Sequence, residues 1–377
     1  MGPPRPFTVT IIGGGIGGLV LAVGLLRRHV PVQIYEAAEA LTEIGLGLSI
    51  GPAAHRAMPL IDPQIRDIYD SLVTTHAVSP GYEQYKQTWF EIVWAGGDHE
   101  SETLMDLKAL PSGKTTLRCA DYLAALVALI PPKIVHFGKR LRRLMETSDK
   151  VRLWFEDGTT ATADVVESML PDESRVKQPQ YSGMYGCRAV FDMEDMVEAV
   201  GDQHARVSTM YIGKGAYAIS YPIMRAKKVK VGLYILSERW DYEAWVRPAN
   251  ARGMGGYVNS LVERMPDPSQ WAIFDHPHLS TYFKSRVAIM GDAAHASTSH
   301  QGAGAGQAIE DAHVLAELLS DSRVTSVDDV VGAQHVVTTS KENAYLLCFC
   351  FEGTFQQRLR WLWDLDVQEQ VEKARRR

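Results

Sequence analysis

The first 35 residues combine unbroken apolar runs with one glycine-rich turn. Residues 7–12 form a continuous run rich in β-branched side chains, which is typical of a buried parallel strand. Residues 13–18 predict a tight turn, residues 19–29 have the apolar spacing of a helix, and residues 32–35 predict a second strand. This order of strand, turn, helix and strand predicts an α/β domain built on a parallel sheet.

The middle of the chain has a different pattern of apolar and polar residues. Residues 121–130 predict a helix that ends at Pro131, and residues 151–155 and 160–166 predict a hairpin around Gly158. Beyond residue 180 the strand-like runs are short and closely spaced; they are 184–191, 205–212, 217–221 and 229–236. Such runs predict an antiparallel sheet, which we interpret as a second domain inserted into the first.

The C-terminal part of the chain repeats the pattern of the first 35 residues, a buried strand followed by a glycine-rich loop and a helix. Residues 287–290 predict a buried strand, which is followed by a glycine-rich loop and a long helix over about 302–319. The tail, residues 354–377, predicts an amphipathic helix. We therefore expect a first domain of residues 1–177 and 281–330, an inserted domain of residues 178–280, and a C-terminal helical segment of residues 331–377.

Composition narrows the partners of the chain. The net charge of −6 argues against nucleic acid, because phosphate binding needs a basic surface. The four cysteines form no CxxC pair and no Cys/His cluster has zinc spacing, so we expect no bound metal and a reducing, cytoplasmic location. No apolar run approaches the roughly 20 residues that span a bilayer, so we expect no membrane segment.

The first glycine-rich turn has the spacing of a nucleotide-binding loop. Gly13, Gly15 and Gly18 occupy the key places of a GxGxxG pattern between a strand and a helix. The free N–H groups at the start of that helix suit a pyrophosphate. Glu36, at the end of the second strand, can accept hydrogen bonds from an adenosine ribose. The plainer alternative is a glycine-rich turn that binds no ligand.

A second loop of this kind lies far along the chain. The strand near residue 288 ends in Gly291-Asp292, at the sheet edge where ligands bind in open α/β folds. Residues 301–306, Gln-Gly-Ala-Gly-Ala-Gly, then open a second helix with free N–H donors. Two such loops suit one long cofactor that reaches from one loop to the other. A further alternative is a simple NAD-dependent dehydrogenase, but such an enzyme needs no second loop.

These motifs together resemble the class A flavoprotein aromatic hydroxylases, and within them the fungal salicylate-hydroxylase-like enzymes. The resemblance extends from about residue 7 to the end of the chain. It is carried by GGGIGGL, Glu36, EIGLGLSIGP at 43–52, GDAAHA at 291–296, HQGAGAGQAIEDA at 300–312 and RWLWD at 360–364. It implies a Rossmann-like FAD-binding domain with a parallel sheet, an inserted antiparallel-sheet substrate domain and C-terminal helices.

The resemblance also implies the chemistry. The cofactor would be FAD, NADPH or NADH would be a transient reductant, and O2 would form a flavin C4a-hydroperoxide that hydroxylates a phenolic aromatic substrate. Where the attacked carbon bears a carboxylate, CO2 can leave. The implied cofactor-binding residues are Gly13, Gly15, Gly18, Glu36 (adenosine ribose), Gly45, Gly47, Arg118, Asp292 (ribityl chain), Gly302, Gly304 and Ala305.

Three side chains are candidates for handling the phenol. Arg188 matches an arginine that reaches substrate in related enzymes, and its fixed cation could bind a carboxylate or phenolate. Tyr217 and Tyr221 are four residues apart and share one face of a strand, so either could hydrogen-bond or deprotonate the phenol. The alternative is an ion-paired Arg188 and two core tyrosines. We interpret His295 as a structural hydrogen-bonding residue rather than a base.

The sequence departs from the family pattern in several places. Residues 167–173 replace the expected GADG-type segment, and Ser299 replaces a proline. The family's flavin-contacting arginine aligns with Cys119 in one register and with Arg118 in the other. Residues 249–255, 330–335 and 353–354 read as joins across missing sequence. These departures motivate a second hypothesis, a catalytically impaired flavin-binding relative. The apolar C-terminal segment could also pair two copies in a homodimer.

Overall fold

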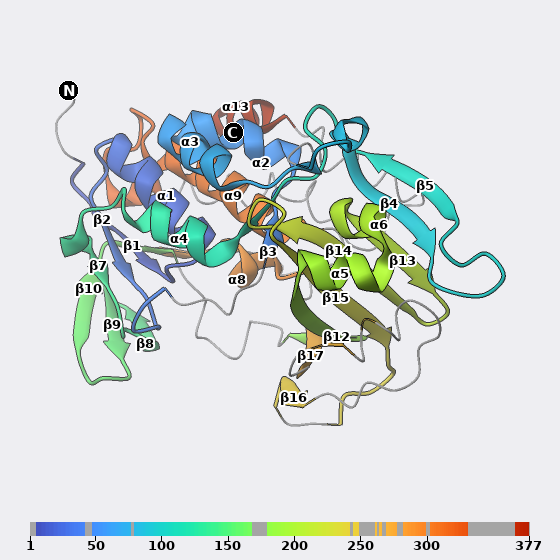
Figure 1. The fold of residues 1–377 in the computed structure, drawn as a ribbon. Coiled ribbons are helices and arrows are strands. Elements are labelled where there is room, and N and C mark those ends of the chain that lie inside the picture. The colour runs from blue at the N-terminus through green and yellow to red at the C-terminus, as the bar shows by residue number, and fades with distance from the viewer. Residues whose placement is uncertain are drawn as a thin grey trace.

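The fold combines a helix-covered parallel sheet with a large, mostly antiparallel sheet (Figure 1). The computed structural model describes residues 5–41, 47–76, 79–167, 179–241, 244–248, 261, 264–265, 269–276, 282–298, 302–330 and 366–376.

The first sheet has six strands in the order β18-β19-β11-β1-β2-β7. Its strands are β1 (Val9–Ile12), β2 (Val32–Tyr35), β7 (Val135–His136), β11 (Val165–Glu167), β18 (Phe283–Lys284) and β19 (Val287–Ala288). All neighbours pair in parallel except β18 and β19, which pair antiparallel. The α/β class and the parallel sheet predicted from the sequence are confirmed.

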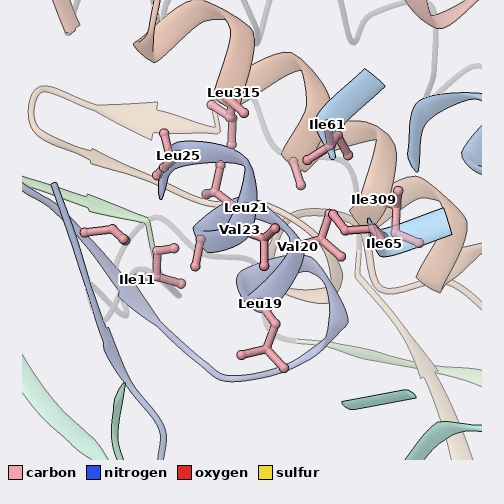
Figure 2. Packing of buried hydrophobic residues seen from close by; sticks show 14 of the residues in the cluster. Ile11, Leu19, Val20, Leu21, Val23, Leu25, Ile61, Ile65, Ile309 and Leu315 are labelled. Atoms are coloured by element: carbon pink, nitrogen blue, oxygen red, sulfur yellow. The ribbon is translucent and has the colours of Figure 1, made fainter. Parts of the chain in front are cut away.

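Helix α1 (Ile16–Arg27) is the centre of the first core. Every residue from Leu19 to Leu25 is buried, because the sheet covers one side of the helix and α2 (Pro52–Ile61) and α9 (Gly304–Leu319) cover the other (Figure 2). A Cβ at Gly24 would lie 2.8 Å from Ile61 Cγ2 and 3.1 Å from Ala316 Cβ, so glycine allows this close approach. The contacts fix the C-terminal half of α1 relative to α2 and α9.

Further helices extend this helical layer (Figure 1). They are α3 (Pro63–Leu72), α4 (Cys119–Val127) and α13 (Val367–Arg376), with short 3-10 turns at Glu83–Tyr85 and Pro132–Ile134. Asp62 ends α2 and caps α3 by accepting a hydrogen bond from Gln64 N at 2.8 Å. The predicted tail helix over 354–377 is described only as α13; residues 354–365 lie outside the described residues.

The second sheet has eight strands in the order β16-β17-β12-β15-β14-β13-β4-β5. Its strands are β4 (Thr88–Trp94), β5 (Thr103–Lys108), β12 (Gln180–Asp192), β13 (Thr209–Gly213), β14 (Ala216–Ile223), β15 (Lys228–Leu236), β16 (Val246–Pro248) and β17 (Ser269–Asp275). The antiparallel runs predicted at 184–191, 217–221 and 229–236 are confirmed. The sheet also includes β4 and β5 from the first segment, and β4 pairs in parallel with β13.

Two predicted strands need correction. The run 205–212 begins as a helix, because α6 (Asp202–Arg206) follows α5 (Met193–Val200) and an Asp202–Arg206 ion pair of 2.7 Å supports its single turn. The run 160–166 divides at Asp164, whose carboxylate accepts hydrogen bonds from Thr8 N at 2.9 Å and from Lys150 Nζ at 2.5 Å. The chain therefore leaves the hairpin there and enters the parallel sheet.

Two small sheets complete the fold. Strands β8 (Leu141–Glu146), β9 (Val151–Phe155) and β10 (Thr160–Ala163) form an antiparallel hairpin sheet, which confirms the hairpin around Gly158. Strands β3 (Gly47–Ser49) and β6 (Thr116–Arg118) pair between the two large sheets (Figure 1). Among the helices that the structure describes, none is long and apolar enough to cross a membrane.

Candidate active site

One cavity of about 530 Å³ joins the parallel sheet to the eight-stranded sheet. On one side it is lined by the loop that connects β1 to α1 and by the segments on either side of α8 (Asp292–His295). On the other side it is lined by side chains of β4, β12, β14 and β15. A cavity of this size, at the carboxyl ends of parallel strands, is the usual place for a cofactor in an open α/β sheet.

The first glycine loop has the shape that a bound pyrophosphate requires. Gly13 has φ +116°, a conformation that favours glycine. A Cβ at Gly18 would lie 2.2 Å from Gly13 O, so the loop and α1 pack without room for a methyl group. A Cβ at Gly15 would meet nothing within 4 Å, and Gly15 lines the cavity as the N-cap of α1. The helix N-terminus therefore faces open space.

Glu36 lies beside this loop at the end of β2. Its carboxylate accepts hydrogen bonds from Gly14 N and, at 2.7 Å, from Ala38 N. The two contacts hold the carboxylate next to the glycine loop, which is compatible with the predicted contact to a ribose.

The second loop is braced by a buried contact between His295 and Asp311. Gly291, with φ +56°, donates its N–H to Asp311 Oδ2 at 2.9 Å, and His295 Nε2 lies 2.7 Å from the same oxygen. This contact supports the interpretation of His295 as a structural hydrogen-bonding residue. The brace sets the turn that points Asp292 into the cavity.

The remaining predicted residues of this loop also line the cavity. Gly302, which has φ +62°, Gly304 and Ala305 lie there at the start of α9. Two helix N-termini, those of α1 and α9, therefore open onto one cavity.

Gly47 connects the two sides of the cavity. A Cβ at this position would lie 2.8 Å from Ile223 Cγ2 and 3.1 Å from the Tyr221 ring. Its carbonyl accepts hydrogen bonds from Tyr221 Oη at 2.8 Å and Lys230 Nζ at 3.1 Å. Gly45, the second glycine predicted for this stretch, lies outside the described residues.

The structure brings two of the three predicted substrate residues to one cavity and places the third in another. Arg188 and Tyr221 line the main cavity, and the Arg188 Cζ lies 5.8 Å from the centroid of the Trp271 ring. Tyr217 instead lines a smaller, apolar cavity of about 360 Å³. Its ring stacks on Tyr234 with 4.8 Å between centroids. Tyr234 is one of the residues that line the main cavity. Tyr217 therefore contacts the lining of that cavity but does not line it itself.

Burial decides what the two tyrosines can do. It raises the pKa of Tyr217 and of Tyr221 far above the ordinary phenol value, so both stay protonated near neutral pH. The hydroxyl proton of Tyr221 is directed to the Gly47 carbonyl. Tyr221 is therefore suited to accept a hydrogen bond from a ligand, and the deprotonating role is disfavoured.

The departures from the family pattern fall partly at the cavity. Arg118 is the N-cap residue of α4 and lies 3.3 Å from Asp121, whereas Cys119 lines the cavity. Glu167, the first residue of the altered segment, lines the cavity at the end of β11. Residues 168–178 and Ser299 lie outside the described residues.

Two cavity residues were missed by sequence reasoning. Lys114, two residues before β6, and Lys230, on β15, are only 4% and 7% exposed. Lys230 carried a signal, because a lysine at a buried position within the run 229–236 is unusual. Lys114 follows a Ser-Gly pair and carried none.

These features fit FAD. A pyrophosphate suits the tight turn at Gly18, the open space at Gly15 and the N–H groups at the helix N-termini. The cavity extends from there to the second glycine-rich loop. Carboxylates lie at two separate points, Glu36 beside the first loop and Asp292 in the lining of the cavity, and carboxylates can accept hydrogen bonds from sugar hydroxyls.

Comparison with known proteins supports the same conclusion. A family model described as an FAD binding domain matches residues 260–323. The 6-methylsalicylate 1-monooxygenase of Aspergillus terreus is 36% identical over 414 residues, covering 97% of this chain and 91% of that protein. A salicylate hydroxylase of Pseudomonas putida is 32% identical, covering 98% and 94%. The first alignment is longer than this chain, so the relative contains residues with no counterpart here.

The fold agrees as well. The structure of a salicylate hydroxylase substrate complex superposes with a TM-score of 0.79 at 26% identity, covering 98% of both chains. The chain therefore belongs to the FAD-dependent monooxygenases of the salicylate hydroxylase type, and FAD is its cofactor.

Proposed function

We propose that this enzyme uses NADPH or NADH and O2 to hydroxylate a phenolic aromatic acid of the salicylate or hydroxybenzoate kind. One O2 and one reduced nicotinamide are consumed, and the products are the hydroxylated ring, water and the oxidised nicotinamide. Where the attacked carbon bears the carboxylate, that group leaves as CO2. The printed names of two relatives, a 6-methylsalicylate 1-monooxygenase and a salicylate hydroxylase, support this substrate class.

A single observation carries the proposal. The cavity that contains both glycine loops continues, without a dividing wall, to Arg188 and Tyr221 on the eight-stranded sheet. FAD, when bound, supplies the transfer of electrons from the nicotinamide to O2 and of one oxygen atom to the ring. A ring held against these side chains would lie in the same enclosure as the cofactor.

The chain's own residues have three tasks. The guanidinium of Arg188 can bind a carboxylate or phenolate, and its buried Nε has no hydrogen-bond partner among the described residues. The Tyr221 oxygen can accept a hydrogen bond while its hydroxyl proton stays hydrogen-bonded to the Gly47 carbonyl. Phe90 and Ile219 present apolar surface to the ring and exclude water. A fixed cation beside the phenol favours the phenolate, which is the more reactive form.

The test is oxidation of NADPH and of NADH by FAD-loaded protein, with and without salicylate, 6-methylsalicylate and 4-hydroxybenzoate. We expect faster oxidation with at least one acid, and a product that has gained oxygen, with or without loss of CO2, by mass spectrometry. Oxidation that no member of the panel accelerates, in protein that retains FAD, would instead support the catalytically impaired relative. Arg188→Met should raise KM for the acid, and Arg188→Lys should restore part of the loss.

A further inference from the structure

The smaller cavity on the eight-stranded sheet, called here the second cavity, is lined mainly by apolar side chains. Its volume is about 360 Å³, and its described lining includes Met184, Met210, Ile212, Tyr217 and Leu236. Among the side chains of this described lining, the Tyr217 hydroxyl is the only polar group. Such a cavity suits an apolar ligand, because a polar one would give up its hydrogen bonds to water there.

The main cavity has a different polarity. Its lining includes Arg188 on the eight-stranded sheet, and Glu167 and Asp292 on the cofactor side. A single ligand that reached into both cavities would therefore carry its polar groups at one end and apolar atoms at the other.

The two cavities follow one another along two neighbouring strands of the sheet. On β14, Ile219 lines the main cavity and Tyr217 lines the second. On β15, Tyr234 lines the main cavity and Leu236 lines the second. Residues two apart in a strand point to the same face and lie about 7 Å from each other. Both cavities therefore lie on one face of the sheet, about two residues apart along each strand.

Two stacked rings stand where the cavities meet. Tyr217 and Tyr234 are directly opposite on β14 and β15, and their rings stack with 4.8 Å between centroids and 14° between planes. A Cβ would lie 3.1 Å from the Tyr234 ring at Gly232 and 3.3 Å from it at Gly186. The Tyr234 ring therefore lies close to the backbone at two positions that have no side chain. An apolar chain that passed from one cavity to the other would contact these aromatic rings.

The rest of the lining is adaptable. Methionine is unbranched and flexible, so Met184 and Met210 can adjust to groups of different shape. The side chain of Leu236 is 61% exposed, so the cavity reaches the protein surface at this end. A chain longer than the cavity can therefore continue towards solvent.

We infer that the second cavity binds an apolar substituent of the aromatic substrate, so that this enzyme prefers aromatic acids with an alkyl chain of several carbons to the unsubstituted acid. The inference rests on the proposed function for the place of the aromatic ring in the main cavity. It assigns substrate specificity to a second site on β12, β13, β14 and β15.

The experiment compares salicylate with alkylated forms of it. The probes are 4-pentylsalicylate, 5-pentylsalicylate and 6-pentylsalicylate, which share the carboxylate and hydroxyl and differ only in where the chain leaves the ring. Their Kd values are measured on the FAD-loaded protein at neutral pH, from the change in flavin absorbance and by calorimetry. Each buried methylene group favours binding, so we expect at least one isomer to bind at least about tenfold more tightly than salicylate.

The variants change the polarity of the second cavity. Leu236→Asp places a carboxylate at its open end, where an alkyl chain would exclude water, so the preference for the alkylated acid should fall by about fivefold or more. Ile212→Thr keeps a β-branched side chain and adds a hydroxyl group to the lining, so the preference should fall by about threefold.

Leu104→Asp is the matched control. Leu104 is a 46% exposed leucine on β5 of the same sheet, and it belongs to the described lining of neither cavity. The substitution adds the same negative charge as Leu236→Asp and should retain the wild-type preference.

Three results would overturn the inference. They are a wild-type protein that binds no pentylsalicylate more tightly than salicylate, a Leu236→Asp protein that keeps the wild-type preference or weakens all ligands equally, and a control that behaves like Leu236→Asp. If Leu236→Asp does not fold or retain FAD, Ile212→Thr tests the same expectation. The proposed function fails separately: preferred binding of a pentylsalicylate without its turnover would reject the monooxygenase reaction and leave the role of the second cavity intact.

Discussion

Gly15 and Gly18 belong to one loop but face different surroundings, so their alanine variants should fail in different ways. A Cβ at Gly18 would lie 2.2 Å from Gly13 O and 3.1 Å from Ile11 Cγ2, and a backbone carbonyl cannot rotate away as a side chain can. A Cβ at Gly15 would meet nothing within 4 Å. Gly18→Ala therefore disturbs the fold, whereas Gly15→Ala places a methyl group in the space assigned to FAD.

The magnitudes follow from these contacts. Overpacking at a rigid site costs about 3 kcal/mol, and the higher helix propensity of alanine in α1 returns about 1 kcal/mol. Gly18→Ala should thus lose about 2 kcal/mol, or roughly 2.5 °C in Tm for a chain of 377 residues. Gly15 has φ −69°, which alanine adopts freely, so Gly15→Ala should change the Tm of the cofactor-free protein by less than about 1 °C. Its Kd for FAD should rise at least about tenfold.

The assay is thermal unfolding of the protein after FAD has been removed, together with FAD titration followed by flavin fluorescence. Gly81→Ala is unsuitable as a control because Gly81 has φ +85°, whereas Gly96→Ala is suitable because a Cβ there meets nothing and its φ lies outside the left-handed region. A Gly15→Ala protein that binds FAD like the wild type would refute the reasoning, as would equal destabilisation by both loop variants.

Three further predictions concern buried polar groups. Tyr221→Phe removes the 2.8 Å hydrogen bond to Gly47 O and should cost about 1 kcal/mol in urea unfolding, because Lys230 still donates to that carbonyl; a loss above about 3 kcal/mol would contradict this. Asp311→Ala leaves the buried Gly291 N–H without its acceptor, so we expect the free energy of unfolding to fall by about 2–4 kcal/mol and FAD to be lost on purification. Full retention of FAD would show that the contacts of Asp311 with Gly291 and His295 are not needed to hold the loop. Burial, with the Asp311 charge adding to it, raises the pKa of Glu310 to about 8. The folded state therefore keeps a proton that the unfolded state releases near pH 4.5, and stability falls as pH rises between those values. Glu310→Gln should be more stable than the wild type, by an increment that grows from pH 6 to about pH 8; an increment independent of pH would reject the assignment.

Local requirements of the backbone made the cofactor side predictable. The tight turn at Gly13 and the close approach at Gly18 can be met only by glycine, so the loop was recognisable in the sequence. The strand and helix on either side are continuous apolar runs, because both are buried. Membership of the monooxygenase family then removes the dehydrogenase alternative.

The substrate side depends on contacts between distant segments, which no local pattern contains. Strand β4 joins the eight-stranded sheet through the pairing of Glu91 with Thr209, more than 100 residues away. The same pairing brings Phe90 towards Tyr221 and creates the setting of Lys114. The domain boundaries, the roles of the individual site residues, the homodimer and the cytoplasmic location stay predictions.

The most direct test of the proposed function is product analysis with FAD-loaded wild-type protein, NADPH or NADH, O2 and an aromatic acid. We expect the acid to accelerate oxidation of the nicotinamide and an oxygen atom from labelled O2 to appear in the product ring. Nicotinamide oxidation that yields only hydrogen peroxide with every acid, and no labelled product, would contradict it.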